Sequence, residues 1–457
     1  MRLTVAVILL ALATAGSAFA HSSARGFVLL LPTNYVILGG TLVVFATFIA
    51  VTLLPGRVFQ PAIHSPATQR SLGLRLPRAL SLFSAAALAA LIWIGFAGPQ
   101  DPVENLLTLT IWTLWWVVIV LLHPLFGNLW AGLNPFAGIY GVMRIGAILK
   151  FPPSLYYIPA CLIFAAFAWF QLVFPAPEDP RRLAIAVSIY AAFTLLAVFL
   201  FGSKAWLEKG DPFGVFLSQL GAAAPLDITQ HIGLRIPGAG LVTRPALPLM
   251  GTFFVLLTLS AISFDGFANT FLWLSAIGIN PLDYPGRTAL VSANTLGLAA
   301  SFFLLAAAYM AAIALGWRWA GRPGSLVAIM GRFVFSLIPI SIAYHFAHYL
   351  GDTLVNLQYL GLALNDPLGN GADLLGLGHY HVTASFQNTA SGSLAIFTAQ
   401  TCAIIIGHII GVGVAHAIAL QPGIPRGAAL KLEVPFTVFM VAYTAFGLWL
   451  LSTPSIT

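Results

Sequence analysis

Residues 341–352 read SIAYHFAHYLGD, and residues 393–416 read SLAIFTAQTCAIIIGHIIGVGVAH. Both stretches are apolar enough for membrane helices, yet they carry four histidines: His345, His348, His408 and His416. The connection between them adds His379 and His381, so this part of the chain holds six of the ten histidines. An ionisable side chain is costly to bury in a membrane helix, and it therefore indicates a functional site.

The composition excludes an ordinary soluble domain. The mean hydropathy is +0.94, 59% of the residues are apolar and 7% are charged, whereas about 25% are charged in soluble domains. The net charge of +7 does not indicate a nucleic-acid partner, because the basic residues are scattered over short connections. Cys161 and Cys402 both lie in apolar runs, which argues against a disulfide framework and a cysteine zinc site. The chain is therefore predicted to be a polytopic protein of the lipid bilayer.

Residues 1–20 have the pattern of a secretory signal peptide, with Arg2, an apolar core and Ala18-Phe19-Ala20 before the cleavage point. An uncleaved first helix is the alternative. Cleavage after Ala20 leaves residues 21–457 as a single transmembrane domain that begins with His21. The α-amino group and imidazole of His21 would then chelate a metal such as copper, unless a histidine follows the cleavage site by chance.

Ten apolar segments are long enough to cross about 30 Å of hydrocarbon. They are residues 34–54, 79–97, 105–123, 154–175, 183–202, 246–265, 288–316, 325–350, 392–420 and 434–452. The fold class is thus an all-α helical bundle of about ten transmembrane helices. The shorter segment 269–279 is predicted to lie at the interface or to re-enter. The long connections 203–245 and 351–391 are predicted to fold back on the membrane surface.

The charges predict an orientation in a bacterial inner membrane. With the mature N-terminus outside, fifteen basic residues fall on the inner side and four on the outer, and the inner excess is the expected bias. Nine acids fall on the outer side: Asp101, Glu104, Glu178, Asp179, Asp265, Asp283, Asp352, Asp366 and Asp373. The two distributions agree, so the N-terminus is predicted to be periplasmic.

His345 and His348 lie three residues apart, which puts them on one face of a helix, and Asp352 lies one turn beyond. Two imidazoles and a carboxylate suit a divalent ion such as Zn, Fe or Cu, without specifying which. The alternative is that these histidines make ordinary hydrogen bonds to the backbone or to neighbouring tyrosines. We take the three residues as candidate metal ligands at the outer end of the eighth span.

His379 and His381 flank one residue of a glycine-rich connection, which is predicted to fold over the eighth span as a lid or to remain an exposed loop. In the lid arrangement, His379 is a further candidate metal ligand. His408 lies in mid-span near Gly407, Gly411 and Gly413, which permit close helix packing. It is a further candidate ligand, or a residue that positions one. His416 lies about 12 Å further along the helix, and a structural hydrogen bond is its expected role.

Asp265 ends the sixth span in SFDGFANT (263–270). We expect it, or His381, to act as a general base, with N-capping of the following short segment as the alternative for Asp265. His123 begins HPLFGNLWAGLNPF (123–136), whose Gly, Asn and Pro residues indicate a broken or re-entrant helix on the opposite side of the membrane. We interpret that stretch as architecture.

Five stretches carry a resemblance to a known family. They are HSSARGFVLLLPT (21–33), HPLFGNLWAGLNPF (123–136), SFDGFANT (263–270), YHFAHY (344–349) and GHIIGVGVAH (407–416). Together they resemble the bacterial membrane proteins described as fenitrothion hydrolase components. The resemblance implies hydrolysis of organophosphorus triesters by a membrane complex with a second type of subunit. It assigns no catalytic residues.

The leading hypothesis is therefore metal-assisted hydrolysis of an apolar phosphotriester near the outer leaflet, where a lipid-borne small molecule meets water. A bound metal would polarise the phosphoryl group and activate a water molecule. Two alternatives remain. One is a transporter or metal-handling protein of the copper type, with histidines at several depths. The other is an accessory subunit that supports a catalytic partner.

Overall fold

The computed structural model describes residues 33–59, 62, 78–143, 146–227, 233–280, 286–378, 380–421, 424–425 and 427–453. The predicted signal peptide, His21 and His379 lie outside these residues. Residues 33–457 cluster as one compact unit, and all that follows concerns the described part of it.

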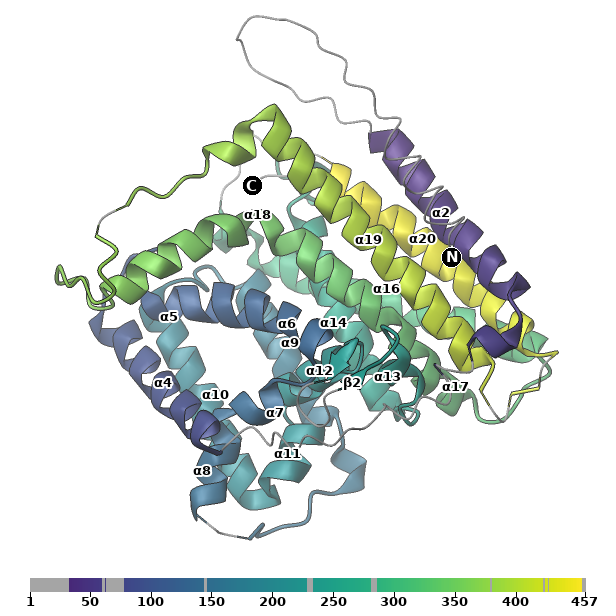
Figure 1. Cartoon of the computed structure of the whole chain (residues 1–457), viewed down its shortest axis with the longest axis horizontal. Helices are drawn as coiled ribbons and strands as arrows, with labels where there is room; N and C mark the ends of the chain where they lie inside the picture. Colours follow the sequence, from purple (N-terminus) through teal and green to yellow (C-terminus); the bar gives the residue numbers. More distant parts are fainter. Residues whose placement is uncertain are drawn as a thin grey trace, which may run out of the picture. The chain divides into compact units, whose positions relative to one another are not determined.

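Ten helices in this part are long and apolar enough to cross a membrane, which confirms the predicted all-α polytopic bundle (Figure 1). The spans are α2 (Thr33–Leu53), α4 (Arg78–Ala97), α5–η2–α6 (Leu106–Leu109, Thr110–Ile119, Val120–Phe126), η3–α9 (Pro153–Leu155, Ile158–Leu172), α10 (Pro180–Phe201), α14 (Leu249–Ala268), α16 (Arg287–Trp319), α17–η5–α18 (Leu326–Phe333, Val334–Leu337, Ile338–Asn365), α19 (Ala390–Ala419) and α20 (Ala429–Ser452). Each coincides with a predicted segment.

Shorter elements connect the spans. They are η1 (Gly56–Val58), α7 (Trp130–Leu133), α8 (Pro135–Met143), α11 (Ser203–Lys209), α12 (Pro212–Gly221), β1 (Leu226–Asp227), β2 (Gly233–Leu234), α13 (Ala239–Val242), α15 (Phe271–Ala276) and η6 (Ser385–Asn388). The two strands pair antiparallel, with Leu226 opposite Leu234. The helix α15 occupies the predicted interfacial segment and is too short to cross the bilayer.

The centre of the bundle is formed by α14, α18 and α19, in which a large share of the residues is buried. α18 packs along α19, and α20 packs against α2, α16 and α19 (Figure 1). Gly407 and Gly411 allow the close approach of α19 to α18, because an added Cβ would lie 2.7 Å from the carbonyl oxygens of Pro339 and Ser336, respectively. Gly413 faces open space, so only two of the three predicted packing glycines make this contact.

The third span changes its helical form at its centre. Residues Thr110–Ile119 form a π-helix, and α6 then contains Pro124. A proline has no N–H to donate to the preceding turn. Beside it, the Nδ1 of His123 lies 2.6 Å from the Ile119 carbonyl oxygen. The other ring nitrogen, Nε2, accepts from the backbone N–H of Trp130 at 3.0 Å. His123 therefore joins α6 to α7, as its architectural interpretation predicts.

The 203–245 connection contains three short helices, α11, α12 and α13, and a small hairpin. Asp211 caps α12 by accepting from the Gly214 N–H at 2.6 Å, and it also accepts from the Tyr190 hydroxyl at 2.6 Å. Burial raises the pKa of the Asp211 carboxyl to about 6. Arg235 and Arg244 donate to backbone carbonyls of α12 and its C-terminal end. The Tyr190 contact joins the connection to α10, and the arginine contacts hold its own elements together.

The eighth span is longer than predicted. The sequence pattern placed a loop from residue 351, but α18 continues to Asn365. The reason is a separate apolar cluster, in which Leu360 and Ala363 pack on Ile94, Leu106 and Leu109 of the second and third spans. The polar connection therefore begins at Asp366, where the carboxylate accepts from the backbone N–H groups of Asn370 and Gly371.

Candidate functional site: a buried acid–base network

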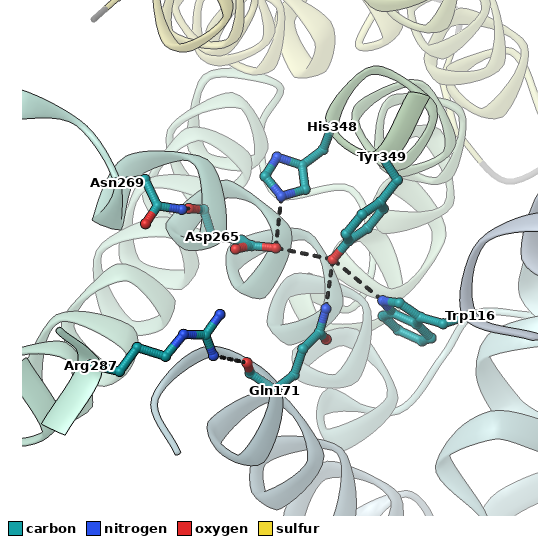
Figure 2. A network of polar contacts seen from close by, with 7 residues as sticks. All are labelled: Trp116, Gln171, Asp265, Asn269, Arg287, His348 and Tyr349. Atoms are coloured by element: carbon teal, nitrogen blue, oxygen red, sulfur yellow. Dashed lines mark hydrogen bonds and ion pairs between the residues drawn. The ribbon is translucent and has the colours of Figure 1, made fainter. Parts of the chain in front are cut away.

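Asp265 and His348 meet inside the bundle. The imidazole Nε2 of His348 lies 2.8 Å from Oδ2 of Asp265. The Tyr349 hydroxyl donates to the same carboxylate oxygen at 3.0 Å. That hydroxyl in turn accepts from Nε2 of Gln171 at 2.7 Å and from the indole Nε1 of Trp116 at 3.3 Å (Figure 2). One carboxylate is thus the acceptor at the centre of a network from four spans.

Each side chain comes from an element that the fold already fixes. Asp265 lies in the last turn of α14, Gln171 in the last turn of α9, and Trp116 in the π-helical stretch η2. His348 and Tyr349 are adjacent on α18, and their rings meet edge to face at 4.6 Å. The side chains of His348 and Asp265 are 29% and 16% exposed. The pair is therefore largely enclosed by protein, but part of each side chain is accessible to solvent.

Arg287 lies beside the network. It begins α16, and its guanidinium donates to the backbone carbonyl of Gln171 at 2.9 Å (Figure 2). This contact joins a fifth span to the network and brings a positive charge to the end of the bundle that contains Asp265. We refer to this end, formed by residues 98–105, 173–179 and the start of α16, as the Asp265 end.

Two cavities border these residues. The first is lined by polar groups of Asp265, Gln171, Ser341 and Tyr349 and by apolar rings including Phe164, and its volume is about 20 Å³. That volume matches about one water molecule. The second, of about 310 Å³, lies at the Asp265 end and is lined by Gln100, Pro102, residues 175–179 and Arg287. Its volume is at the lower end of the range for small-molecule sites.

The three predicted metal ligands do not converge on one point. His345 is buried, and its Nε2 lies 2.7 Å from the backbone carbonyl of Trp116, whereas His348 bonds to Asp265. Asp352 is exposed one turn beyond His348. Within the described ranges, no group of three or more His, Cys, Asp or Glu side chains is arranged to hold a metal ion. The three residues thus have separate surroundings among the described residues, and a metal ion bound by them stays a prediction.

The other candidates have separate positions. His381 is exposed, and its neighbours Tyr380 and Thr383 bond to Gln358, about 15 Å along α18 from His348. The connection does return towards the site further on, where Gln387 donates to the Gly351 carbonyl at 2.7 Å. His408 lies inside the bundle, with Nδ1 2.8 Å from the Ile404 carbonyl.

The capping alternative for Asp265 is wrong. The helix that follows, α15, is capped by Thr270, whose hydroxyl accepts from the Trp273 N–H at 3.2 Å. The Asp265 side chain instead turns into the bundle towards His348 and Tyr349. Asp265 is therefore free of a local capping role.

Sequence reasoning missed three members of the network. Gln171, Trp116 and Arg287 had no role, and Tyr349 entered only as an alternative partner for the histidines. A usable signal was present for Gln171 and Arg287, since each is a polar residue within a few positions of a span end. Trp116 gave none, because tryptophan in an apolar span is ordinary.

The ten apolar helices in the described part of the chain assign it to the multi-pass membrane proteins. No protein-family model, curated protein or solved structure matches the chain. The resemblance to fenitrothion hydrolase components stays a prediction.

Proposed function

We propose that Asp265 and His348 are an acid–base pair that transfers protons in this membrane protein. The observation that carries the proposal is the 2.8 Å contact between His348 Nε2 and Asp265 Oδ2. Ionisable groups within a bundle of this kind are costly, and proton relays are among their recognised uses. Partial exposure of both side chains allows exchange with water.

The activity that this pair best fits is hydrolysis of an apolar phosphotriester, the reaction that the resemblance implies. A water molecule in the 20 Å³ cavity would lie beside Asp265, the expected general base. As the water oxygen attacks phosphorus, the carboxylate takes its proton and the aryloxide leaves. The 310 Å³ cavity would hold the substrate, with Arg287 facing the phosphoryl group.

The test is hydrolysis of a nitroaryl phosphotriester by the full chain in lipid nanodiscs. The reaction is measured by the absorbance of the nitrophenol that it releases. We expect Asp265→Asn and His348→Gln each to lower kcat/KM by about 100-fold or more. The double variant should lose little beyond that, because groups that act as a unit are non-additive. The control is Glu104→Gln, which alters an exposed carboxylate at the same end of the bundle. Parent-like turnover in Asp265→Asn would remove the general-base role.

Proton-coupled transport is the second candidate. It is favoured by ionisable side chains at several depths of the bundle, including His408 and His416, which lie eight residues apart on α19. A metal-handling role, with Zn, Fe or Cu held by His345, His348 and Asp352 or by His21, stays a prediction, as does a second membrane subunit. Metal analysis of the purified chain, alone and with co-purified partners, tests both.

We further propose that the Asp265 end faces the periplasm of a bacterial inner membrane. The support is the charge distribution along the sequence, with fifteen basic residues assigned to the opposite side. Asn370 is exposed in the connection between α18 and α19. With Cys161 and Cys402 removed, Asn370→Cys should react with an impermeant thiol reagent in intact spheroplasts. Labelling only after lysis would reverse the orientation.

A further inference from the structure

A second acid–base pair lies between α19 and α20. Nδ1 of His416 is 2.9 Å from Oε2 of Glu433, and the side chains are only 8% and 2% exposed. The ring of Phe59 meets the His416 ring edge to face at 4.8 Å. The other carboxylate oxygen of Glu433, Oε1, has no hydrogen-bond partner among the described residues. A buried carboxyl oxygen with this unused capacity calls for a functional explanation.

The end of α19 allows His416 to carry a positive charge. His416 lies in the last turn of α19, where the helix dipole favours a cation, and its partner Glu433 lies in the second turn of α20. Packing alone would be served as well by apolar side chains of similar size. The placement therefore suits a site whose protonation changes.

Polar side chains lead from this pair towards Asp265. His408 lies about 12 Å from His416 along α19. It is fully buried, its Nε2 has no partner among the described residues, and its ring lies 6.3 Å from that of Tyr344. The Tyr344 hydroxyl donates to the Tyr443 carbonyl at 3.0 Å. The Tyr443 hydroxyl is hydrogen-bonded to Ser263, two residues before Asp265 on α14.

We propose that His416 and Glu433 form a second proton-binding site, and that protons pass between it and the Asp265–His348 pair by way of His408 and Tyr443. Uptake of one proton at one pair and release of one at the other moves a single H⁺, and only O–H and N–H bonds form and break. Among the described residues, no direct hydrogen bond joins His416 to His408, His408 to the tyrosines, or Ser263 to Asp265, so each of these steps requires bridging water. The inference rests on the proposed proton transfer at Asp265 and His348.

The test uses the full chain in liposomes that contain a pH-sensitive dye, with a potassium diffusion potential set by valinomycin. The parent should acidify or alkalinise the lumen faster than protein-free liposomes. Glu433→Gln, His408→Gln and Asp265→Asn should each abolish this protein-dependent flux, while Glu104→Gln should retain it. All variants are first compared for insertion and thermal stability.

A second measurement needs no variant. Dicyclohexylcarbodiimide is apolar and reacts with protonated carboxyl groups in membranes, so it should add its mass to the peptide that contains Glu433 and stop the flux of the parent. Undiminished flux after full modification of Glu433, or in Glu433→Gln, would overturn the route. A parent no faster than empty liposomes would overturn it too. The proposed function is judged separately, by phosphotriester turnover in Asp265→Asn.

Discussion

The two acid–base pairs of the bundle have nearly the same bond length and very different surroundings. His348 and Asp265 are 2.8 Å apart, and His416 and Glu433 are 2.9 Å apart. Asp265 also accepts from Tyr349, which is bonded to Gln171 and Trp116. Glu433, in contrast, has His416 as its hydrogen-bond partner and an edge-on aromatic ring nearby.

The difference indicates how strongly each carboxylate depends on its histidine. Asp265 is partly exposed and has a second donor, so it retains a hydrogen bond and some water if His348 is lost. Glu433 is enclosed, and loss of His416 would leave a buried carboxyl group with neither. Loss of the histidine is therefore expected to lower stability more at His416–Glu433 than at Asp265–His348, whatever each pair does in proton transfer.

The strongest test compares His416→Ala with His348→Ala in detergent. His416→Ala should lower the free energy of unfolding by about 3–5 kcal/mol, because it strands a buried acid. His348→Ala should cost about 1–3 kcal/mol, the range for a lost hydrogen bond at a group that keeps another donor. The double variant His416→Ala/Glu433→Leu should recover most of the loss. Equal losses at the two sites would remove the distinction.

Asp211 sharpens the comparison, because the partners of this buried carboxyl among the described residues are the Tyr190 hydroxyl and the Gly214 N–H, and neither is a cation. Burial raises its pKa from 3.8 to about 6, so the folded chain binds more protons than the unfolded chain between these values. The stability contribution is present below about pH 4 and is lost as the pH rises towards 6, by about 3 kcal/mol.

Thermal unfolding of the parent across pH 4–7 should therefore show a decline that Asp211→Asn removes. Asparagine preserves the N-cap of α12, so the variant isolates the titration. A decline of the same size in Asp211→Asn would assign it to other groups.

The smallest expected effect concerns the packing that fixes α19 between the two pairs. Gly411→Ala would place a methyl group 2.7 Å from the Ser336 carbonyl, whereas Gly413→Ala meets open space. Overpacking should cost about 1–3 kcal/mol at Gly411, against about 0.5 kcal/mol or less at Gly413. Denaturant midpoints of the two variants provide the measurement, and a greater loss at Gly413 would contradict the packing of α18 on α19.

The spans could be predicted because hydropathy is a local property of the chain. All ten predicted segments coincide with helices, and the longest error, at the end of α18, came from tertiary contacts of Leu360 and Ala363. The partnership of Asp265 with His348 could not be predicted, since it depends on the rotation of two helices about their axes. The sequence did indicate both residues, Asp265 as a general base and His348 as a metal ligand.

Glu433 was missed for a simpler reason. The predicted last span began at residue 434, which left this acid in a connection, whereas α20 begins at Ala429. Counting back one helical turn would have placed a carboxyl group inside an apolar helix. His416 does make the hydrogen bond that was predicted for it. The sequence did not show that its partner is Glu433.

The π-helical stretch Thr110–Ile119 has a consequence for tolerance to changes in chain length. A π-helical turn holds more residues than an α-helical turn, so this span contains slack that a one-residue deletion would take up without breaking the helix. A deletion in the α-helical part between Trp116 and His123 would instead rotate the side chains on one side of it by about 100° relative to those on the other. Trp116 and His123 face fixed partners on different elements. A change in the length of this span is therefore tolerated only where Trp116 and His123 still point towards their partners.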